Sequence, residues 1–234
     1  MPVAIVTGGS GALGSAVARA LSKRGHAIVL AGSPRAKERL EPLVKELGRA
    51  TACAADLAVS DGWSAVLRAA ESLGEAPSLA ALVAGGWKGG TPIHAENDDE
   101  VWKAMLRSNL DTVYRAFRAL LPGMVERKRG SIVVVGSRNA ERPSFGAKAA
   151  AYTASKSAAV ALAQATAAEV LEHGVRINAI LPSTMDTPAN RASMPKVDPS
   201  KWVTIESAAA VIAFLLSDDA RDISGAALPV YGRA

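Results

Sequence analysis

The chain has 234 residues, of which 49% are hydrophobic and 21% are charged. This balance excludes a disordered chain and supplies enough apolar surface for one core. The 27 basic and 22 acidic residues leave a formal net charge of +5, and no long basic stripe runs through the sequence. We therefore expect no nucleic-acid partner and interpret the positive balance as attraction of an anionic cofactor or an acidic substrate.

Cysteine and histidine are too rare for a disulfide scaffold or for the usual zinc ligand sets. Cys53 is the single cysteine, and the chain has three histidines. No apolar run reaches the ~18 residues of a membrane-spanning helix, and no basic segment precedes the first apolar residues. We therefore expect a cytoplasmic protein with no membrane partner and no structural metal.

Short apolar runs alternate with amphipathic segments along the whole chain. Strands are predicted at 3–6, 27–30, 50–54, 79–83, 131–135, 176–180 and 227–230, and helices at about 12–23, 35–47, 61–73, 97–124, 152–172 and 205–216. This alternation predicts an α/β protein, one Rossmann domain over residues 1–234 with a doubly wound, seven-stranded, mostly parallel sheet. Segment 182–204 lacks periodicity and is expected to be a loop that covers the substrate.

A glycine-rich turn joins the first predicted strand to the first predicted helix. Glycines let the backbone approach a pyrophosphate, and the helix N-terminus offers N–H groups that have no partner within the helix. The same glycines could also serve only to make the turn tight. We predict a dinucleotide site at Gly8, Ser10, Gly11, Ala12, Leu13 and Gly14.

The end of the second predicted strand bears on the choice of cofactor. An acidic residue there would bind the ribose hydroxyls of NAD and repel the additional phosphate of NADP. The chain has Gly32 at this place, followed by Ser33 and Arg35, which can donate hydrogen bonds to a phosphate. We therefore predict NADP(H) in preference to NAD(H). The alternative for Arg35 is a solvated residue at the start of a helix.

Tyr152 and Lys156 are four residues apart in a predicted helix, so they share one face. A nearby ammonium group favours the phenolate and lowers the pKa of the phenol, which can then exchange a proton with a carbonyl or alcohol oxygen. Ser137 ends the fifth predicted strand at the carboxyl edge of the sheet, where ligands bind in such folds. This arrangement predicts acid–base catalysis by Tyr152.

These motifs resemble those of the short-chain dehydrogenase/reductase family. Gly8 and Gly14 match its cofactor turn, in which Ala12 stands where a middle glycine is usual. The four catalytic positions of the family are matched in order by Asn109, Ser137, Tyr152 and Lys156. The resemblance implies an NAD(P)-dependent oxidoreductase that transfers hydride between the nicotinamide and a carbonyl or alcohol substrate.

The resemblance also implies individual roles. Tyr152 would move the proton and Ser137 would orient the oxygen. Lys156 would bind the nicotinamide ribose, and Asn109 would anchor a water relay. Further cofactor contacts are implied at Asp56, Leu57, Ala84, Gly85, Gly86, Tyr152, Lys156, Pro182, Thr184, Met185 and Thr187.

Two alternatives remain open at this point. Segments 82–90 and 181–202 are similar to dihydropteridine reductases, which makes a pterin reductase one alternative. Those enzymes lack the catalytic serine and asparagine and carry an acid after the second strand, whereas this chain has Ser137, Asn109 and Gly32. The second alternative is a non-catalytic NADP(H)-binding regulator, against which the intact catalytic set argues.

Substrate contacts and assembly are predicted from position in the chain. Residues that flank strand ends or lie in the long loop are the candidates for substrate contact: Trp87, Arg138, Asn139, Arg142 and Trp202. For the two tryptophans, packing within the loops is an equal alternative. The alanine-rich helices predicted at 97–124 and 152–172 resemble the dimer-forming pair of the family, which implies a homodimer or homotetramer.

Overall fold

The computed structural model describes residues 2–233 and contains one seven-stranded sheet in the order β3-β2-β1-β4-β5-β6-β7. All of its strand pairs are parallel, whereas the sequence predicts a mostly parallel sheet. The α/β Rossmann fold is thereby confirmed. The strands are β1 (Val3–Thr7), β2 (Ala27–Gly32), β3 (Ala50–Ala54), β4 (Pro77–Leu82), β5 (Gly130–Val135), β6 (Val175–Pro182) and β7 (Ala227–Val230).

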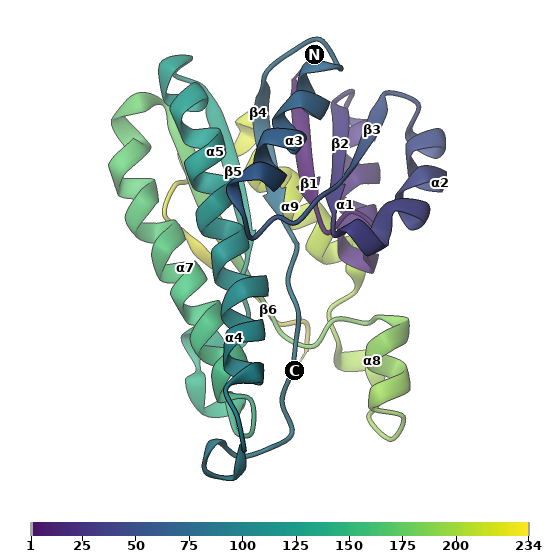
Figure 1. Ribbon diagram of the computed structural model, residues 1–234, viewed down its shortest axis with the longest axis vertical. Coiled ribbons are helices and arrows are strands. Elements are labelled where there is room, and N and C mark those ends of the chain that lie inside the picture. Colours follow the sequence, from purple (N-terminus) through teal and green to yellow (C-terminus); the bar gives the residue numbers. More distant parts are fainter. Residues whose placement is uncertain (1, 234) are drawn as a thin grey trace.

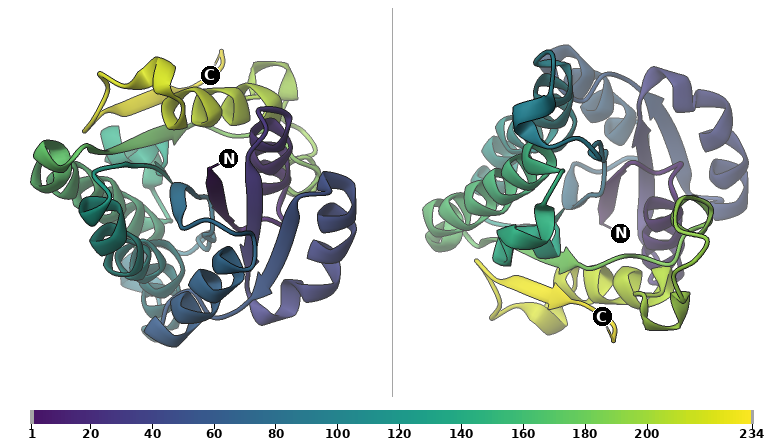
Figure 2. Two further views of the ribbon diagram at one scale, coloured as in Figure 1. Left: turned by 90° about the horizontal axis from the view of Figure 1, so that it is seen from above. Right: turned by 90° about the horizontal axis from the view of Figure 1, so that it is seen from below.

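Helices cover both faces of the sheet (Figures 1 and 2). One face is covered by α1 (Ala12–Lys23), α2 (Lys37–Leu47) and α9 (Ile205–Leu216). The opposite face is covered by α3 (Ser60–Glu71), α5 (Thr112–Glu126) and α7 (Ala150–Val170). The short helices α4 (Glu100–Leu106), α6 (Arg138–Glu141) and α8 (Pro188–Ser193) lie beyond the carboxyl edge of the sheet or close to it.

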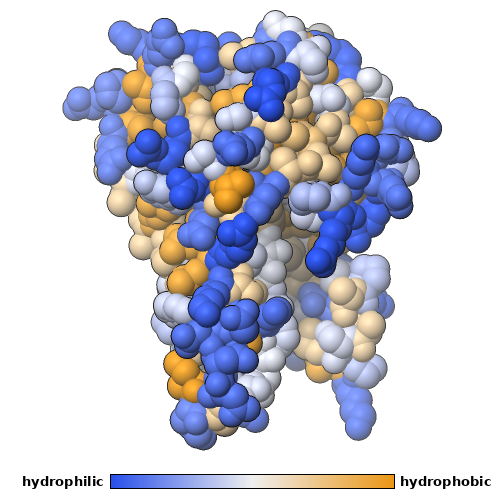
Figure 3. Space-filling model, in the orientation of Figure 1, coloured by the Kyte–Doolittle hydropathy of each residue, from blue (hydrophilic) through white to orange (hydrophobic). Residues whose placement is uncertain are grey.

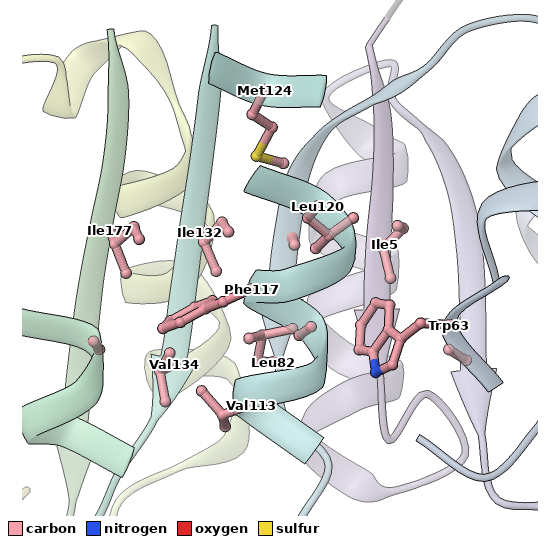
Figure 4. Packing of buried hydrophobic residues seen from close by; sticks show 14 of the residues in the cluster. Ile5, Trp63, Leu82, Val113, Phe117, Leu120, Met124, Ile132, Val134 and Ile177 are labelled. Atoms are coloured by element: carbon pink, nitrogen blue, oxygen red, sulfur yellow. The ribbon is translucent and has the colours of Figure 1, made fainter. Parts of the chain in front are cut away.

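Each face of the sheet has its own hydrophobic core. Neighbouring residues of a strand point to opposite faces, so Ile5 enters the core under α3 and α5 while Val6 enters the core under α1 and α9. Figure 4 shows the first core, in which side chains of α5 point toward the central strands. The central strands, from β2 through β1, β4 and β5 to β6, are therefore largely buried on both faces, which explains their continuous apolar runs.

The predicted element bounds agree with the structure to within two residues, with one exception. The helix expected over 97–124 is divided into α4, a π-helical turn (Arg107–Asp111) and α5. Apolar periodicity continues through this division, so the sequence pattern alone does not reveal it. A π-helical turn inside an α-helix is frequently found at a functional site.

The long segment 182–204 has more internal structure than a loop. It contains α8, which begins after Thr187, whose hydroxyl oxygen accepts a hydrogen bond from the Asn190 N–H at 3.1 Å. A bridge between Met185 and Val203 closes the base of the segment. Within residues 2–233, no helix is long and apolar enough to cross a lipid bilayer.

Candidate active site

The predicted site residues lie along the carboxyl edge of the sheet. The strands β1, β2, β4, β5 and β6 all end at this edge because they are parallel. Figure 3 shows that the surface is hollowed on this side, between α8 and the column formed by α4 and α7. Open α/β sheets bind their ligands outside the carboxyl ends of the strands.

The glycine turn after β1 leaves the N-terminus of α1 open. Gly8 has a φ of +66°, a conformation that favours glycine. A Cβ atom on Gly14 would lie 2.1 Å from the carbonyl oxygen of Gly8, so the helix packs directly on the turn. Gly11 precedes the helix and supplies no side-chain cap, which leaves the first N–H groups of the helix, those of Ala12 and Leu13 among them, available to an anion.

The segment after β2 presents polar groups to solvent. Ser33 and Arg35 are both exposed, and the Ser33 hydroxyl makes no capping bond to the 3-10 turn Pro34–Ala36. A Cβ atom on Gly32 would lie 3.1 Å from the Cβ of Ala36, so a larger side chain at this position would press on the following helix. The segment thus offers donors and no carboxylate.

Asp56, which follows β3, is held by two partners. One carboxylate oxygen accepts a hydrogen bond from the Ala58 N–H at 3.0 Å, and the other accepts one from the guanidinium of Arg107 at 2.5 Å. The neighbouring Leu57 is buried in the core. Arg107 carries no signal in the sequence beyond its position two residues before Asn109.

The catalytic candidates Ser137 and Tyr152 interact through their hydroxyl groups. The oxygen of Ser137 accepts a hydrogen bond from the Asn139 N–H at 3.3 Å. Burial raises the pKa of the Tyr152 phenol, and the hydrogen bond with Ser137 lowers it by a smaller amount. The sequence-based expectation of a lowered pKa is therefore wrong for this structure, because desolvation outweighs the favourable contact. The phenol is protonated near neutral pH.

Lys156 lies one turn further along α7, where its side chain is 6% exposed. Its Nζ atom donates a hydrogen bond to the carbonyl oxygen of Val135 at 2.6 Å. Burial lowers the pKa of Lys156 to about 8. A Cβ atom on Gly85 would lie 2.7 Å from the side-chain oxygen of Asn109 and 3.2 Å from this Nζ atom, so the backbone of Gly85 packs closely beside both groups.

Asn109 lies in the π-helical turn and connects two parts of the site. Its side-chain oxygen accepts a hydrogen bond from the Gly86 N–H at 2.9 Å. Its amide nitrogen donates to the Gly86 carbonyl at 3.1 Å and to the Ser155 hydroxyl at 3.0 Å. The turn after β4 is thereby tied to α7 beside Lys156. Ser155 was not identified by the sequence analysis, although it directly precedes Lys156 in the chain.

The loop between Ser137 and Tyr152 is pinned to the start of α7. The amide of Asn139 donates a hydrogen bond to the Thr153 hydroxyl at 3.1 Å. A Cβ atom on Gly146 would lie 1.9 Å from the same hydroxyl oxygen, so the loop packs closely against Thr153. We call Asn139, Gly146 and Thr153 the loop latch.

The two tryptophans predicted to contact substrate lie in different environments. Trp87 follows β4 and is 62% exposed, whereas Trp202 is 8% exposed and packs inside the protein. Arg138 stacks on the ring of Phe145, with 4.4 Å from its Cζ atom to the ring centre. Arg142 is exposed and lies near Glu141.

The segment after β6 is held by both backbone and side-chain contacts. The Thr184 carbonyl accepts a hydrogen bond from the Val203 N–H at 2.9 Å, and the Met185 carbonyl accepts one from the Asn190 amide at 2.8 Å. Pro182 is buried at the end of β6. The oxygen of the Thr187 hydroxyl is used in capping α8, and its proton is free to be donated.

Comparison with known proteins agrees with this geometry. A family model described as short chain dehydrogenase matches residues 2–198. A 4-formylbenzenesulfonate dehydrogenase from Comamonas testosteroni is 32% identical over 98% of this chain and 96% of its own length. A galactitol 2-dehydrogenase (L-tagatose-forming) from Cereibacter sphaeroides is 31% identical over 98% of this chain and 93% of its own.

A solved structure gives the same result. An oxidoreductase of the short chain dehydrogenase/reductase family from Burkholderia thailandensis superimposes with a TM-score of 0.84, at 30% identity, and the match covers 99% of this chain and 91% of that one. The catalytic set, the glycine turn and these similarities agree on one family. This chain belongs to the short-chain dehydrogenase/reductase family, whose members are oxidoreductases that use a nicotinamide cofactor.

Proposed function

We propose that this protein is an NADP(H)-dependent reductase that transfers hydride between the nicotinamide and a carbonyl or alcohol group of a small molecule. The observation that carries this proposal is the position of the half-buried, protonated phenol of Tyr152 beside Ser137 and one helical turn from Lys156. A protonated phenol is the form that can give a proton to a carbonyl oxygen. This state suits reduction of a carbonyl compound.

The residues present fit a dinucleotide. Gly8 and Gly14 shape the turn, and the uncapped start of α1 offers N–H groups to a pyrophosphate. Gly85 leaves the space beside the Lys156 ammonium open to a ribose. When bound, the cofactor supplies the hydride. The preference for NADP(H) rests on the exposed Ser33 and Arg35 and on the absence of an acid at Gly32.

The chain's own groups then handle the proton. Ser137 accepts a hydrogen bond from the Asn139 N–H, so its own proton can be donated to the substrate oxygen. Tyr152 donates its proton to the same oxygen during reduction. Lys156 carries its charge at pH 7, because its pKa is about 8, and this charge favours the phenolate that is left behind.

The two alternatives are not favoured. Relatives of this chain are named as dehydrogenases. Dihydropteridine reductases lack the catalytic serine and asparagine, whereas this chain has Ser137 and Asn109.

We also propose a homodimer or homotetramer formed through α4, α5 and α7, since α7 exposes alanines at positions 154, 161, 165 and 168. A cytoplasmic location and the absence of a nucleic-acid partner complete the proposal.

The test follows nicotinamide absorbance for purified protein with NADPH and NADH, across ketones, quinones, β-ketoesters, 4-formylbenzenesulfonate and a quinonoid dihydropterin. For Tyr152→Phe we expect turnover to fall by ~100-fold or more, with NADPH binding retained. Tyr114→Phe is the control, because Tyr114 is 42% exposed on α5. Equal turnover by wild type and Tyr152→Phe contradicts the proposal, as does tight cofactor binding without turnover of any substrate.

A further inference from the structure

The surface next to Ser137 carries a guanidinium group that no carboxylate neutralises. Arg138 is the first residue of α6 and is half-buried. Its Cζ atom lies 4.4 Å from the ring centre of Phe145 and 6.0 Å from that of Tyr231. Within the described chain, residues 2–233, its side chain makes no hydrogen bond and no ion pair. Its N–H donors are therefore available to a ligand.

Neighbouring charged groups are already engaged. The Nε atom of Arg142 lies 3.8 Å from the Glu141 carboxylate, and the hydroxyl of Tyr231 donates a hydrogen bond to the same carboxylate. Burial, followed by the Glu141 contact, raises the pKa of Tyr231 to about 12, so the ring stays neutral near pH 7. The group formed by Arg138, Glu141, Arg142, Phe145 and Tyr231 thus has two positive charges against one negative charge.

Stacking on an aromatic ring leaves the N–H donors at the edge of the Arg138 guanidinium free to bind a ligand. An aromatic ring covers a face of the guanidinium plane, whereas the N–H donors point outward within that plane. A planar carboxylate, or a sulfonate, binds this edge through two parallel hydrogen bonds. Phe145 and Tyr231 therefore restrict the orientation of the charge without using up its hydrogen-bonding capacity.

The group lies beside the candidate active site. Arg138 directly follows Ser137, and in the right-hand view of Figure 2 the short helix α6 lies between α7 and β7. The backbone carbonyl of Tyr231 accepts a hydrogen bond from the Ser183 hydroxyl at 2.8 Å. This contact fixes the group to the carboxyl end of β6, where the site's long loop begins.

We propose that Arg138 binds an anionic group of the substrate, so that the preferred substrates are carbonyl compounds with a carboxylate or a sulfonate. The inference rests on the proposed function, because it assumes that Ser137 and Tyr152 hold the carbonyl oxygen. The formal net charge of +5 favours the approach of such a substrate.

A second hollow near the site has the opposite charge. A cavity of about 500 Å³ between α4 and the start of α7 is lined by Ile93, Glu96, Asn97, Asp98, Asp99, Trp102 and Ala151. Its carboxylates would attract a cationic substrate instead. Comparing an amine-bearing aldehyde with a carboxylate-bearing one therefore shows whether the substrate binds at the acidic cavity or at Arg138.

The first test measures kcat/KM for 4-formylbenzoate, benzaldehyde and 4-(aminomethyl)benzaldehyde with NADPH. We expect wild type to prefer 4-formylbenzoate, and Arg138→Gln to lower the ratio of its kcat/KM to that of benzaldehyde by ~10- to 100-fold. Arg138→Lys should restore part of the preference. The control is Arg68→Gln, which removes an equal charge in the last turn of α3, at the opposite edge of the sheet, and should leave the ratio unchanged.

A second measurement does not depend on turnover. Isothermal titration calorimetry with benzoate in the presence of NADP⁺ should show binding to wild type and to Arg68→Gln, and at least ~10-fold weaker binding to Arg138→Gln. Benzoate binding through Arg138 without reduction of any aldehyde would overturn the proposed reaction and leave the anion site standing. An unchanged ratio in Arg138→Gln, a preference for the amine, or no benzoate binding by wild type overturns the inference.

Discussion

Lys156 is a buried charge whose protonation is linked to folding. Burial holds its pKa at about 8 against an ordinary value of 10.5. Between these two pH values the unfolded chain binds more protons than the folded protein at this position, so the free energy of unfolding rises as the pH increases. The raised pKa of Tyr152 has the opposite effect: it lowers the free energy of unfolding as the pH increases, but only at a pH near or above the ordinary tyrosine value of 10.0.

We expect Lys156 to add roughly 2 kcal/mol to the free energy of unfolding between about pH 8 and pH 10. Urea unfolding curves at these two pH values measure the difference. In Lys156→Met this rise should be missing, because no ammonium group is left to deprotonate. The exposed Lys45 provides the control Lys45→Met, which should behave like wild type. A rise of the same size in Lys156→Met would refute the linkage.

At the scale of elements, the loop latch joins α6 to α7 close to Ser137 and Tyr152, the proposed catalytic residues. Asn139 is two residues after Ser137, and Thr153 is one residue after Tyr152. Their hydrogen bond of 3.1 Å therefore sets how the end of β5 approaches the first turn of α7. Asn139 is a candidate for substrate contact by its position in the chain, and in the structure its side-chain nitrogen donates a hydrogen bond to Thr153.

Replacing Thr153 by valine keeps the shape of the side chain and removes the acceptor for the Asn139 amide. We expect kcat to fall by ~3- to 10-fold, the equivalent of one hydrogen bond, with little change in the Kd for NADPH. Thr153→Ser should retain most of the activity because the hydroxyl is restored. Thr166→Val, at a buried position further along α7, is the matched control. A kcat for Thr153→Val equal to that of wild type would show that the latch does not position Ser137.

At the scale of the whole molecule, the proposed cofactor site connects elements that are far apart in the sequence. Its residues come from the turn after β1, the ends of β2, β3, β4 and β6, and the start of α7. A ligand bound only to this assembled edge stabilises the entire fold by mass action. The size of this stabilisation also reports which cofactor is preferred.

We expect NADPH at about 100 times its Kd to raise Tm by roughly 5–10 °C, and NADH at the same concentration to raise it less. Arg35→Gln should bring the NADPH shift down to that of NADH, because the guanidinium that would contact the additional phosphate is lost. Lys45→Gln tests whether removing any positive charge from this region is enough to reduce the Tm shift caused by NADPH. Thermal unfolding in the absence of cofactor shows whether the variants are intact. Equal shifts for both cofactors in wild type would mean that Gly32, Ser33 and Arg35 do not favour NADP(H).

Some features follow from local patterns and were predicted correctly. Apolar runs and amphipathic periods depend on residues close in the chain, so the strands and five of the six predicted helices lie where expected. The spacing of Tyr152 and Lys156 places them on one face of α7 by helix geometry alone. Apolar spacing alone does not reveal the π-helical turn at Asn109, whose side chain contacts Gly86 and Ser155, both distant in sequence.

The sequence by itself determined the alternating α/β order, the position of the glycine turn and the placement of Tyr152 and Lys156 on one helix face, because each depends on short-range spacing. Only the tertiary structure decided how these groups are solvated and paired. The pairing of Asp56 with Arg107, the latch between Asn139 and Thr153, and the unneutralised Arg138 all depend on contacts between distant segments. The pKa of Tyr152 likewise depends on burial by the whole fold, which no spacing of residues encodes.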